Sequence, residues 1–187
     1  AYWRAKLALP LPVIDWPNAL PRPKVMTHMG LTLPFQFNDE ETQRLRALAR
    51  RESTTLFNVL LTAQIRLIAQ ITALTDVVIG IPVRCRDQEE SQNVIGFFVN
   101  TIAIRVPVHA TDTFTTTLKL VSAAVREGLE HQMLPFQVVL NELKVPRDLT
   151  RTPVFQTFFS YQDVTNRSGQ FDGRPYTQIN VDKSSTH

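Results

Sequence analysis

The chain of 187 residues is long enough for one domain with a sizeable core, or for one lobe of a larger domain. Hydrophobic residues make up 43% of it and charged residues 20%, and the net charge of +3 is too small to argue for nucleic acid. The single cysteine, Cys85, excludes an internal disulfide and suits a reducing compartment. No run of 18 apolar residues and no signal peptide is visible, so we expect no membrane segment.

The first third of the chain predicts a connector followed by an edge strand. Residues 10–24, PLPVIDWPNALPRPK, contain five prolines. Because each proline fixes φ and removes a donor, we expect an extended stretch that lies along a surface. Residues 30–37, GLTLPFQF, alternate as a strand does, and Pro34 favours an edge position or a bulge.

Two helices are predicted next. Asn38 and Glu41 have the spacing of an N-cap and its return acid, which predicts a helix over 39–51. A more apolar helix follows, to about residue 73, and is expected to be mostly buried. Its polar residues recur every four positions and predict one narrow solvent-exposed stripe: Asn58, Thr62, Arg66 and Gln70.

The rest of the chain alternates strands and helices. Apolar or alternating patterns predict four strands, over residues 75–83, 94–108, 153–162 and 174–181. Asp112 is expected to cap a helix that ends near residue 130, and Pro135 suits the first turn of a helix over 135–143. This order of elements indicates an α/β fold, a two-layer sandwich with a mixed β-sheet covered by helices.

Asn100 is the one amide in the apolar stretch VIGFFVNTIAIR, residues 94–105. A buried amide without partners costs roughly 1–3 kcal/mol. Either local groups satisfy it, so that it pins the strand as a structural amide, or the strand borders a polar gap where water or a substrate does.

The strongest charged cluster of the sequence consists of Arg147, Asp148 and Arg151. An acid between two arginines predicts a network in which the carboxylate orients a guanidinium. A solvated loop network of little energetic value is the equal alternative.

The histidines and the cysteine form no recognisable catalytic or metal-binding pattern. None of His28, His109, His131 and His187 has a partner at metal-ligand spacing. No nucleotide-binding glycine motif and no G-x-S-x-G elbow is present. His131, at a helix end, fits a C-terminal dipole partner better than a catalyst. Cys85 is expected to be a small hydrophobe or a surface thiol at a strand end.

Three stretches resemble three successive late motifs of the condensation domains of non-ribosomal peptide synthetases: VIGFFVNTIAIR (94–105), HQMLPFQ (131–137) and RDLTRTPVF (147–155). Their order, their spacing and similar flanks extend the resemblance over nearly the whole chain. The family's histidine motif, HHxxxDG, belongs to its N-terminal lobe and is absent here, since no two histidines are adjacent. Cys85 is a smaller departure, at a position where the family usually has a small residue, whereas Arg86 matches.

The resemblance implies an acetyltransferase-like C-terminal lobe: residues 1–29 would connect two lobes, and residues 30–187 would be a lobe truncated at its C-terminal end. In this family the lobes enclose a tunnel. Carrier proteins present thioesters there on phosphopantetheine arms, and an amine attacks one thioester to form an amide. Implied partners are peptidyl carrier proteins, the N-terminal lobe and adjacent domains of a cytoplasmic synthetase of antibiotic biosynthesis. No nucleic acid, membrane, metal or directly bound cofactor is implied.

The resemblance assigns no catalytic residue to this chain, which is expected to be inactive alone. It places seven residues at the tunnel or in structural motifs: Asn100, Thr101, His131, Gln132, Arg147, Asp148 and Arg151. Two alternatives stay open, a lobe of a related epimerization or heterocyclization domain and a non-catalytic lobe that recruits carrier proteins. The sequence upstream of Ala1 would distinguish them. A lobe without its partner is expected to expose apolar surface and to self-associate.

Overall fold

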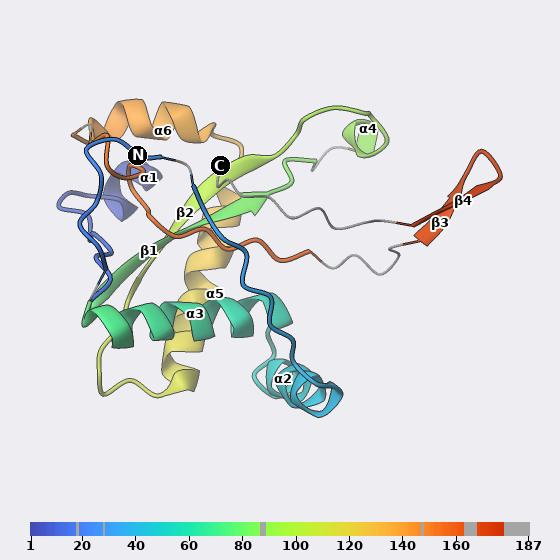
Figure 1. Cartoon of the computed structure of the whole chain (residues 1–187), viewed down its shortest axis with the longest axis horizontal. Coiled ribbons are helices and arrows are strands. Elements are labelled where there is room, and N and C mark those ends of the chain that lie inside the picture. Colours follow the sequence, from blue (N-terminus) through green and yellow to red (C-terminus); the bar gives the residue numbers. More distant parts are fainter. Residues whose placement is uncertain (18, 28, 87–88, 147, 163–167, 178–187) are drawn as a thin grey trace.

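The structure, a computed structural model, describes residues 1–187 except 18, 28, 87–88, 147, 163–167 and 178–187 (Figure 1). Its elements are, in chain order, α1 (Tyr2–Lys6), α2 (Asp39–Arg51), α3 (Leu56–Thr72), β1 (Asp76–Val83), α4 (Glu89–Gln92), β2 (Asn100–Pro107), α5 (Phe114–Glu130), α6 (Phe136–Leu143), β3 (Ser168–Phe171) and β4 (Arg174–Thr177).

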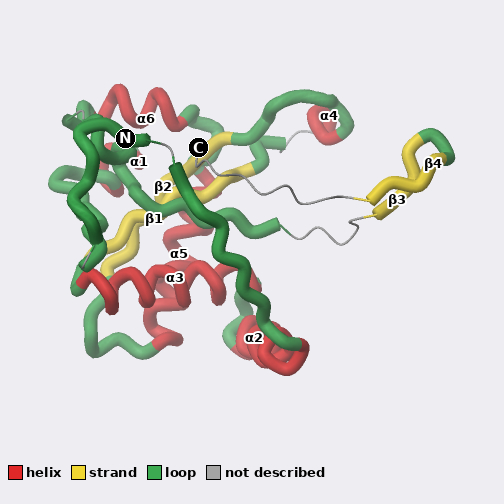
Figure 2. Tube along the Cα trace, in the orientation of Figure 1, coloured by secondary structure: helices red, strands yellow, loops and turns green. Residues whose placement is uncertain are grey.

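The antiparallel hairpin of β1 and β2 forms the centre of the fold, with Asp76 opposite Pro107 at one end and Val83 opposite Asn100 at the other. Both strands are buried on both faces over most of their length, as their continuous apolar sequences predict. Helices α3 and α5 pack against this hairpin and against each other, and Figure 2 shows all three helices α3, α5 and α6 around it.

Gly80 joins a third backbone segment to the hairpin. Its N–H donates to the carbonyl of Thr157 (3.0 Å), and its carbonyl accepts from the N–H of Phe159 (2.8 Å), in a parallel bridge. A Cβ at position 80 would lie 2.4 Å from the ring of Phe155, so only glycine permits this approach. The β1–β2 sheet therefore has one parallel bridge beside its antiparallel pairing, and the strand predicted over 153–162 is reduced to this bridge.

Helix α5 follows its predicted apolar pattern. Leu118, Val121 and Val125 are buried against the hairpin and α3. Gly128 lies so close to β2 that a Cβ there would sit 3.0 Å from the Ile104 side chain. The predicted cap was wrong by one residue, because the Thr113 side chain accepts the capping bond and the Asp112 carboxylate accepts from His109 N–H instead.

Helix α2 begins with the predicted capping box, since the Asn38 side chain accepts from Glu41 N–H (2.8 Å) and Glu41 accepts from Asn38 N–H (2.8 Å). Among the described residues, no single helix has the length and apolar composition needed to cross a membrane. Helices α2 and α3 would meet those two criteria only as a pair, and they are bent by 104° at their junction.

The polar stripe of α3 was wrongly predicted to face solvent at its first two positions, whereas Gln70 at its end is exposed. Asn58 and Thr62 are buried, because the stripe faces α5 and the turn before α3. Asn58 Nδ2 donates to Thr54 Oγ1 (2.9 Å), and Arg66 donates to the carbonyl of Asp112 (2.8 Å) and to Thr117 Oγ1 (2.9 Å). For Arg66, polar groups of α5 and the turn before it take the place of water, which the sequence of one helix does not reveal, whereas Asn58 Oδ1 is buried without a hydrogen-bond partner among the described residues.

Two predicted strands differ in the structure. Residues 30–37 form no strand pairing among the described residues, and residues 94–99 form a loop, so β2 begins only at Asn100. The predicted strand over 174–181 is β4, which pairs with β3 in a hairpin that projects from the body in Figure 1; residues 178–181 lie outside the described residues.

Candidate functional site

Asn100 fastens the start of β2 to the turn between α5 and α6, residues 131–135. Its Nδ2 donates to the carbonyls of Gln132 (2.7 Å) and Leu134 (2.8 Å). Its Oδ1 accepts from the N–H of Phe136 (3.1 Å), the first residue of α6. Backbone groups therefore satisfy both ends of the amide, which supports the structural alternative for Asn100.

The same turn is held from two further elements. Trp3 Nε1 of α1 donates to the carbonyl of His131 (3.2 Å), and the Cys85 thiol, just after β1, lies 3.5 Å from the carbonyl of Gln132. Gln132 thus contributes through its backbone. Cys85 is half-buried against the core, in agreement with its prediction as a small hydrophobe.

The His131 ring packs on α1 rather than pointing into a catalytic cluster. It stacks on the Tyr2 ring with 3.8 Å between centroids and 7° between planes, and its Nδ1 lies 3.0 Å from the carbonyl of Glu127. Burial raises the pKa of the Tyr2 hydroxyl, with smaller contributions from the Glu127 and Glu130 carboxylates. His131 caps the end of α5, as expected for a histidine at that position.

Thr101 continues β2 directly after Asn100. It is half-buried and pairs with Pro82 in the register of the hairpin. Asn100, Thr101, His131 and Gln132, predicted from two separate motifs, thus lie at one junction between the hairpin and the α5–α6 turn.

The charged cluster lies elsewhere, between the connector and the loop after α6. Arg147 is outside the described residues. Asp148 Oδ1 accepts from the N–H (2.8 Å) and the hydroxyl (2.6 Å) of Thr150, and these bonds, followed by the nearby Arg151 charge, lower the pKa of the carboxyl. Arg151 Nε lies 2.8 Å from Asp148 Oδ2, an ion pair without hydrogen-bond alignment, and Arg151 Nη1 donates to Asp15 Oδ1 (3.4 Å). Asp148 thus pairs with Arg151, whose guanidinium also contacts Asp15 of the connector.

A cleft of about 750 Å³ opens beside this cluster. Connector residues 9–13 form one wall, and α6 with the loop after it forms the other; Asp148 and Arg151 lie on its lining. The lining is mainly apolar, so the cleft suits an extended apolar group with a polar end. Within the described part of the chain, no three His, Cys, Asp or Glu side chains lie close enough to hold a metal ion.

Arg86 was noted in the sequence only as a match to the family, and the structure shows that it holds a loop. Its guanidinium donates to the carbonyls of Val94 (2.8 Å) and Gly96 (3.3 Å), and also to those of Ser91 and Gln92. It lies over the Phe98 ring at 4.1 Å from the centroid. The one signal in the sequence was its agreement with the resemblance.

The loop that Arg86 holds, residues 94–99, is called here the apolar loop. Ile95 is fully exposed and Phe97 is 90% exposed, whereas the Phe98 ring is half-buried against Arg86. The interpretation of this stretch as a buried strand was therefore wrong for its first half. An apolar loop fixed from beneath by one guanidinium can present a preformed surface to another element or to a substrate.

Arg105 likewise binds several backbone carbonyls, here at the start of the connector. Its guanidinium pairs with Asp76 (2.7 Å and 2.9 Å) and donates to the carbonyls of Ala8 (2.7 Å), Lys6 (3.4 Å) and Pro10 (3.3 Å). The connector is therefore fastened to β2 at its start and to the charged cluster further along.

The model of the Condensation domain family matches residues 1–186. The chain is 37% identical over 173 residues to a linear gramicidin synthase of Brevibacillus parabrevis, and 35% identical over 165 residues to a surfactin synthase of Bacillus subtilis (strain 168). These matches cover 92% and 88% of this chain but only 2% and 5% of the relatives, so the chain spans a small part of their length.

Solved structures agree. A four-domain nonribosomal peptide synthetase bound to AMP and glycine superposes with a TM-score of 0.84 at 29% identity, over 88% of this chain and 12% of that one. The X-domain from teicoplanin biosynthesis superposes with a TM-score of 0.77 at 25% identity, over 84% of this chain and 35% of that one. With a family model that matches almost its whole length, this chain belongs to the condensation-domain family of non-ribosomal peptide synthetases.

Proposed function

We propose that the chain forms one wall of the reaction site of a condensation domain, in which an amine and a thioester held by carrier proteins are joined as an amide. The assembly of two family motifs at one junction, through the three hydrogen bonds of Asn100, carries this proposal. Attack of an amine on a thioester depends mainly on orientation and the exclusion of water, which a rigid wall can supply.

The catalytic group would come from an N-terminal lobe. No pair of adjacent histidines occurs in the chain, and the His131 ring stacks on Tyr2 of α1. The exposed side chains of Ile95 and Phe97 suit contact with such a lobe or with the thioester chain. Phosphopantetheine would reach the site on peptidyl carrier proteins, from adjacent domains of a cytoplasmic, antibiotic-producing synthetase, and the chain itself would bind no cofactor.

Residues 1–29 would be the inter-lobe connector, and residues 30–187 would belong to the C-terminal lobe. The connector lies along the lobe surface, with Leu7 and Ile14 fully buried and the Ile14 N–H donating to Gln156 Oε1 (2.9 Å). Such anchoring would fix the angle at which a second lobe meets this one. The polar Arg151–Asp15 contact adds a tie near the cleft.

A reconstitution tests the proposal. The chain is mixed with loaded donor and acceptor carrier proteins, with and without a separately produced N-terminal lobe that carries an intact HHxxxDG motif, and amide product is measured. We expect product only when both lobes are present. Product from the purified chain alone, or none from the reconstituted pair when the covalently linked domain is active, would overturn the division of roles between the lobes.

A further inference from the structure

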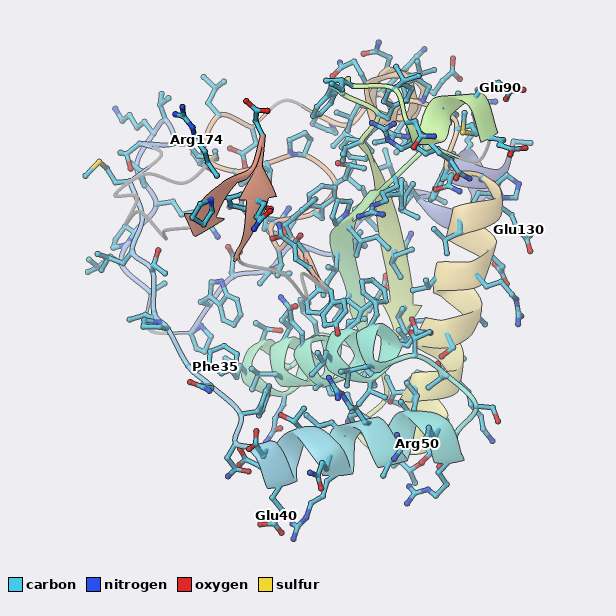
Figure 3. All side chains as sticks on the ribbon, turned by 90° about the vertical axis from the view of Figure 1, so that its right-hand side faces the viewer. Phe35, Glu40, Arg50, Glu90, Glu130 and Arg174 are labelled. Carbon is cyan, nitrogen blue, oxygen red and sulfur yellow. The ribbon has the colours of Figure 1, made fainter. Side chains whose placement is uncertain are left out.

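The turn between α5 and α6, residues 131–135, is held by side chains of other elements. It follows Glu130, the last residue of α5, which Figure 3 labels. Its first carbonyl, at His131, accepts from Trp3 Nε1 of α1, and two later carbonyls accept from the Asn100 amide of β2. The backbone of one turn thus joins α1 to the start of β2.

Trp3 is the buried residue of α1. Its side chain is 6% exposed, and its ring lies 3.7 Å from the position that a Cβ on Gly128 would take, so it packs on the last turn of α5. The Tyr2 ring meets the Trp3 ring edge to face, with 4.9 Å between centroids, and stacks on the His131 ring. His131 is therefore contacted at its carbonyl by Trp3 and at its ring by Tyr2.

The ion pairs of α1 are weaker links. Arg4 pairs with Glu142 of α6, and Lys6 pairs with Glu127 of α5 (2.6 Å), and all four side chains are exposed. Exposed ion pairs contribute little to stability, because water screens them and two long side chains must be ordered. The buried indole contact is therefore expected to be the main polar link between α1 and the turn.

β2 meets this assembly at two points. Asn100 binds the turn, and Arg105, further along the same strand, donates to three carbonyls of residues 6–10, where α1 passes into the connector. The contacts close a ring, called here the frame: it runs from Asn100 to the turn, to Trp3, along residues 3–10, and through Arg105 back to β2. Because both ends of the frame lie on one strand, α1 keeps a fixed place relative to the start of β2.

We propose that Trp3 is a positioning residue for the amide-forming reaction: through the His131 carbonyl it fixes the α5–α6 turn, and the turn, through Asn100, fixes the start of β2. This rests on the proposed function, in which the connector joins a catalytic lobe to this one. The frame then sets the alignment of that lobe with the wall of the reaction site. Trp3 itself touches no reacting group.

Amide hydrogen exchange of the chain tests the frame without any activity. Trp3→Phe keeps an aromatic ring and removes the indole donor, so exchange should rise at least fivefold at the Phe136 N–H, whose bond to Asn100 depends on the turn. Trp16→Phe is the matched control, at a connector residue that is 41% exposed, and it should leave this exchange unchanged. Benzothienylalanine at position 3 keeps the shape of the indole without its N–H, and so separates loss of the bond from loss of packing.

Steady-state kinetics of the assembled domain, with an N-terminal lobe and loaded carrier proteins, tests the positioning role. We expect Trp3→Phe and Trp3→benzothienylalanine to lower kcat tenfold or more, normalised to the folded fraction from circular dichroism, because a displaced wall impairs orientation. KM for the acceptor carrier protein should change less than twofold, because the buried Trp3 side chain cannot contact a carrier protein. A merely structural role would reduce the folded fraction and leave the normalised kcat unchanged.

Three results would overturn the proposal: unchanged exchange at Phe136 in Trp3→Phe, an unchanged normalised kcat in both Trp3 variants, or equal effects of Trp3→Phe and Trp16→Phe. A wild-type assembly that forms no amide would overturn the proposed function, and with it the role of Trp3 in the reaction. The exchange measurement on the chain alone distinguishes that case, since it reports on the frame whether or not the assembly is active.

Discussion

Residues 94–99 and residues 100–107 follow each other in one continuous apolar run, yet the structure treats them in opposite ways. The first six residues form the exposed apolar loop, whereas the next eight form β2, where Ile102, Ile104 and Val106 are each no more than 2% exposed. β2 pairs with β1 and packs on α5. The apolar loop instead has the carbonyls of Val94 and Gly96 bound by Arg86, and its Ile95 and Phe97 side chains are exposed.

The difference shows that apolar composition does not decide burial; the groups that satisfy the backbone do. A segment that pairs with a neighbouring strand is incorporated into the sheet, whereas a segment whose carbonyls are bound by one guanidinium can stay at the surface. Asn100 marks the boundary between the two, because its side chain leaves the strand to bind the α5–α6 turn.

The largest expected difference between the halves is in core stability. Ile104→Ala removes a side chain that is 2% exposed and touches α5, and it should lower the free energy of unfolding by about 2–5 kcal/mol. Ile95→Ala makes the same chemical change at a fully exposed position, and it should change that free energy by no more than about 0.5 kcal/mol. Urea unfolding followed by circular dichroism measures both. A similar cost at the two positions would show that the apolar loop is buried in solution.

Substitution at the boundary should have an intermediate effect. Asn100→Leu leaves two carbonyls and the Phe136 N–H without their partner, at an expected cost of about 2 kcal/mol in unfolding free energy. Asn100→Asp keeps the acceptor for Phe136 but sets a carboxylate against the two carbonyls, so it should not restore stability. Full stability in either variant would contradict the role of Asn100 as a clamp.

Substitution of Arg86 should change the local hydrogen exchange of the apolar loop strongly and the free energy of unfolding only weakly. Arg86→Lys keeps the charge but cannot reach several carbonyls in one plane, so amide hydrogen exchange should rise at residues 91–98 while the unfolding free energy changes by less than about 1 kcal/mol. Arg84→Lys is the matched control and should leave exchange in that loop unchanged. Unchanged exchange in Arg86→Lys would show that the apolar loop keeps its shape without the guanidinium.

The smallest expected effect concerns pH at the exposed charged cluster. Bonds from Thr150 lower the folded-state pKa of Asp148, so the ionised carboxylate favours the folded state above the unfolded pKa of about 3.9. That contribution should fall away as the pH drops below about 4 and through the lowered folded pKa. Asp148→Asn should therefore show a slightly smaller fall in melting temperature between pH 5 and pH 2 than the wild type. A larger fall in the variant would reverse the sign.

Local patterns predicted much of the fold. The capping box of Asn38, the apolar face of α5 and the glycine-containing β1 were all readable, because each depends on neighbours within one element. The burial of Asn58 and the surface position of Ile95 were not, because each depends on groups outside its own element: the turn before α3, which contacts α5, in one case, and Arg86 in the other.

The residues of the candidate site could be predicted from the sequence, but their roles could not. Asn100 and His131 could be placed near each other only through the resemblance, and the choice between substrate and backbone as the partner of Asn100 needed the coordinates of the α5–α6 turn. Arg105 and Arg86 were missed because carbonyl ligands leave no trace in a sequence: any residue supplies one.

Because Arg86 binds backbone carbonyls, the backbone course of the apolar loop does not depend on which side chains the loop exposes. The guanidinium contacts main-chain oxygens and the Phe98 ring. The backbone conformation of the loop is therefore fixed by Arg86 and Phe98 and not by the exposed residues. Ile95 and Phe97 can then be exchanged for other side chains while the loop keeps its course. For protein engineering, residues 95 and 97 can therefore be varied in a library, and the variants screened for altered binding selectivity, while the rest of the chain stays unchanged.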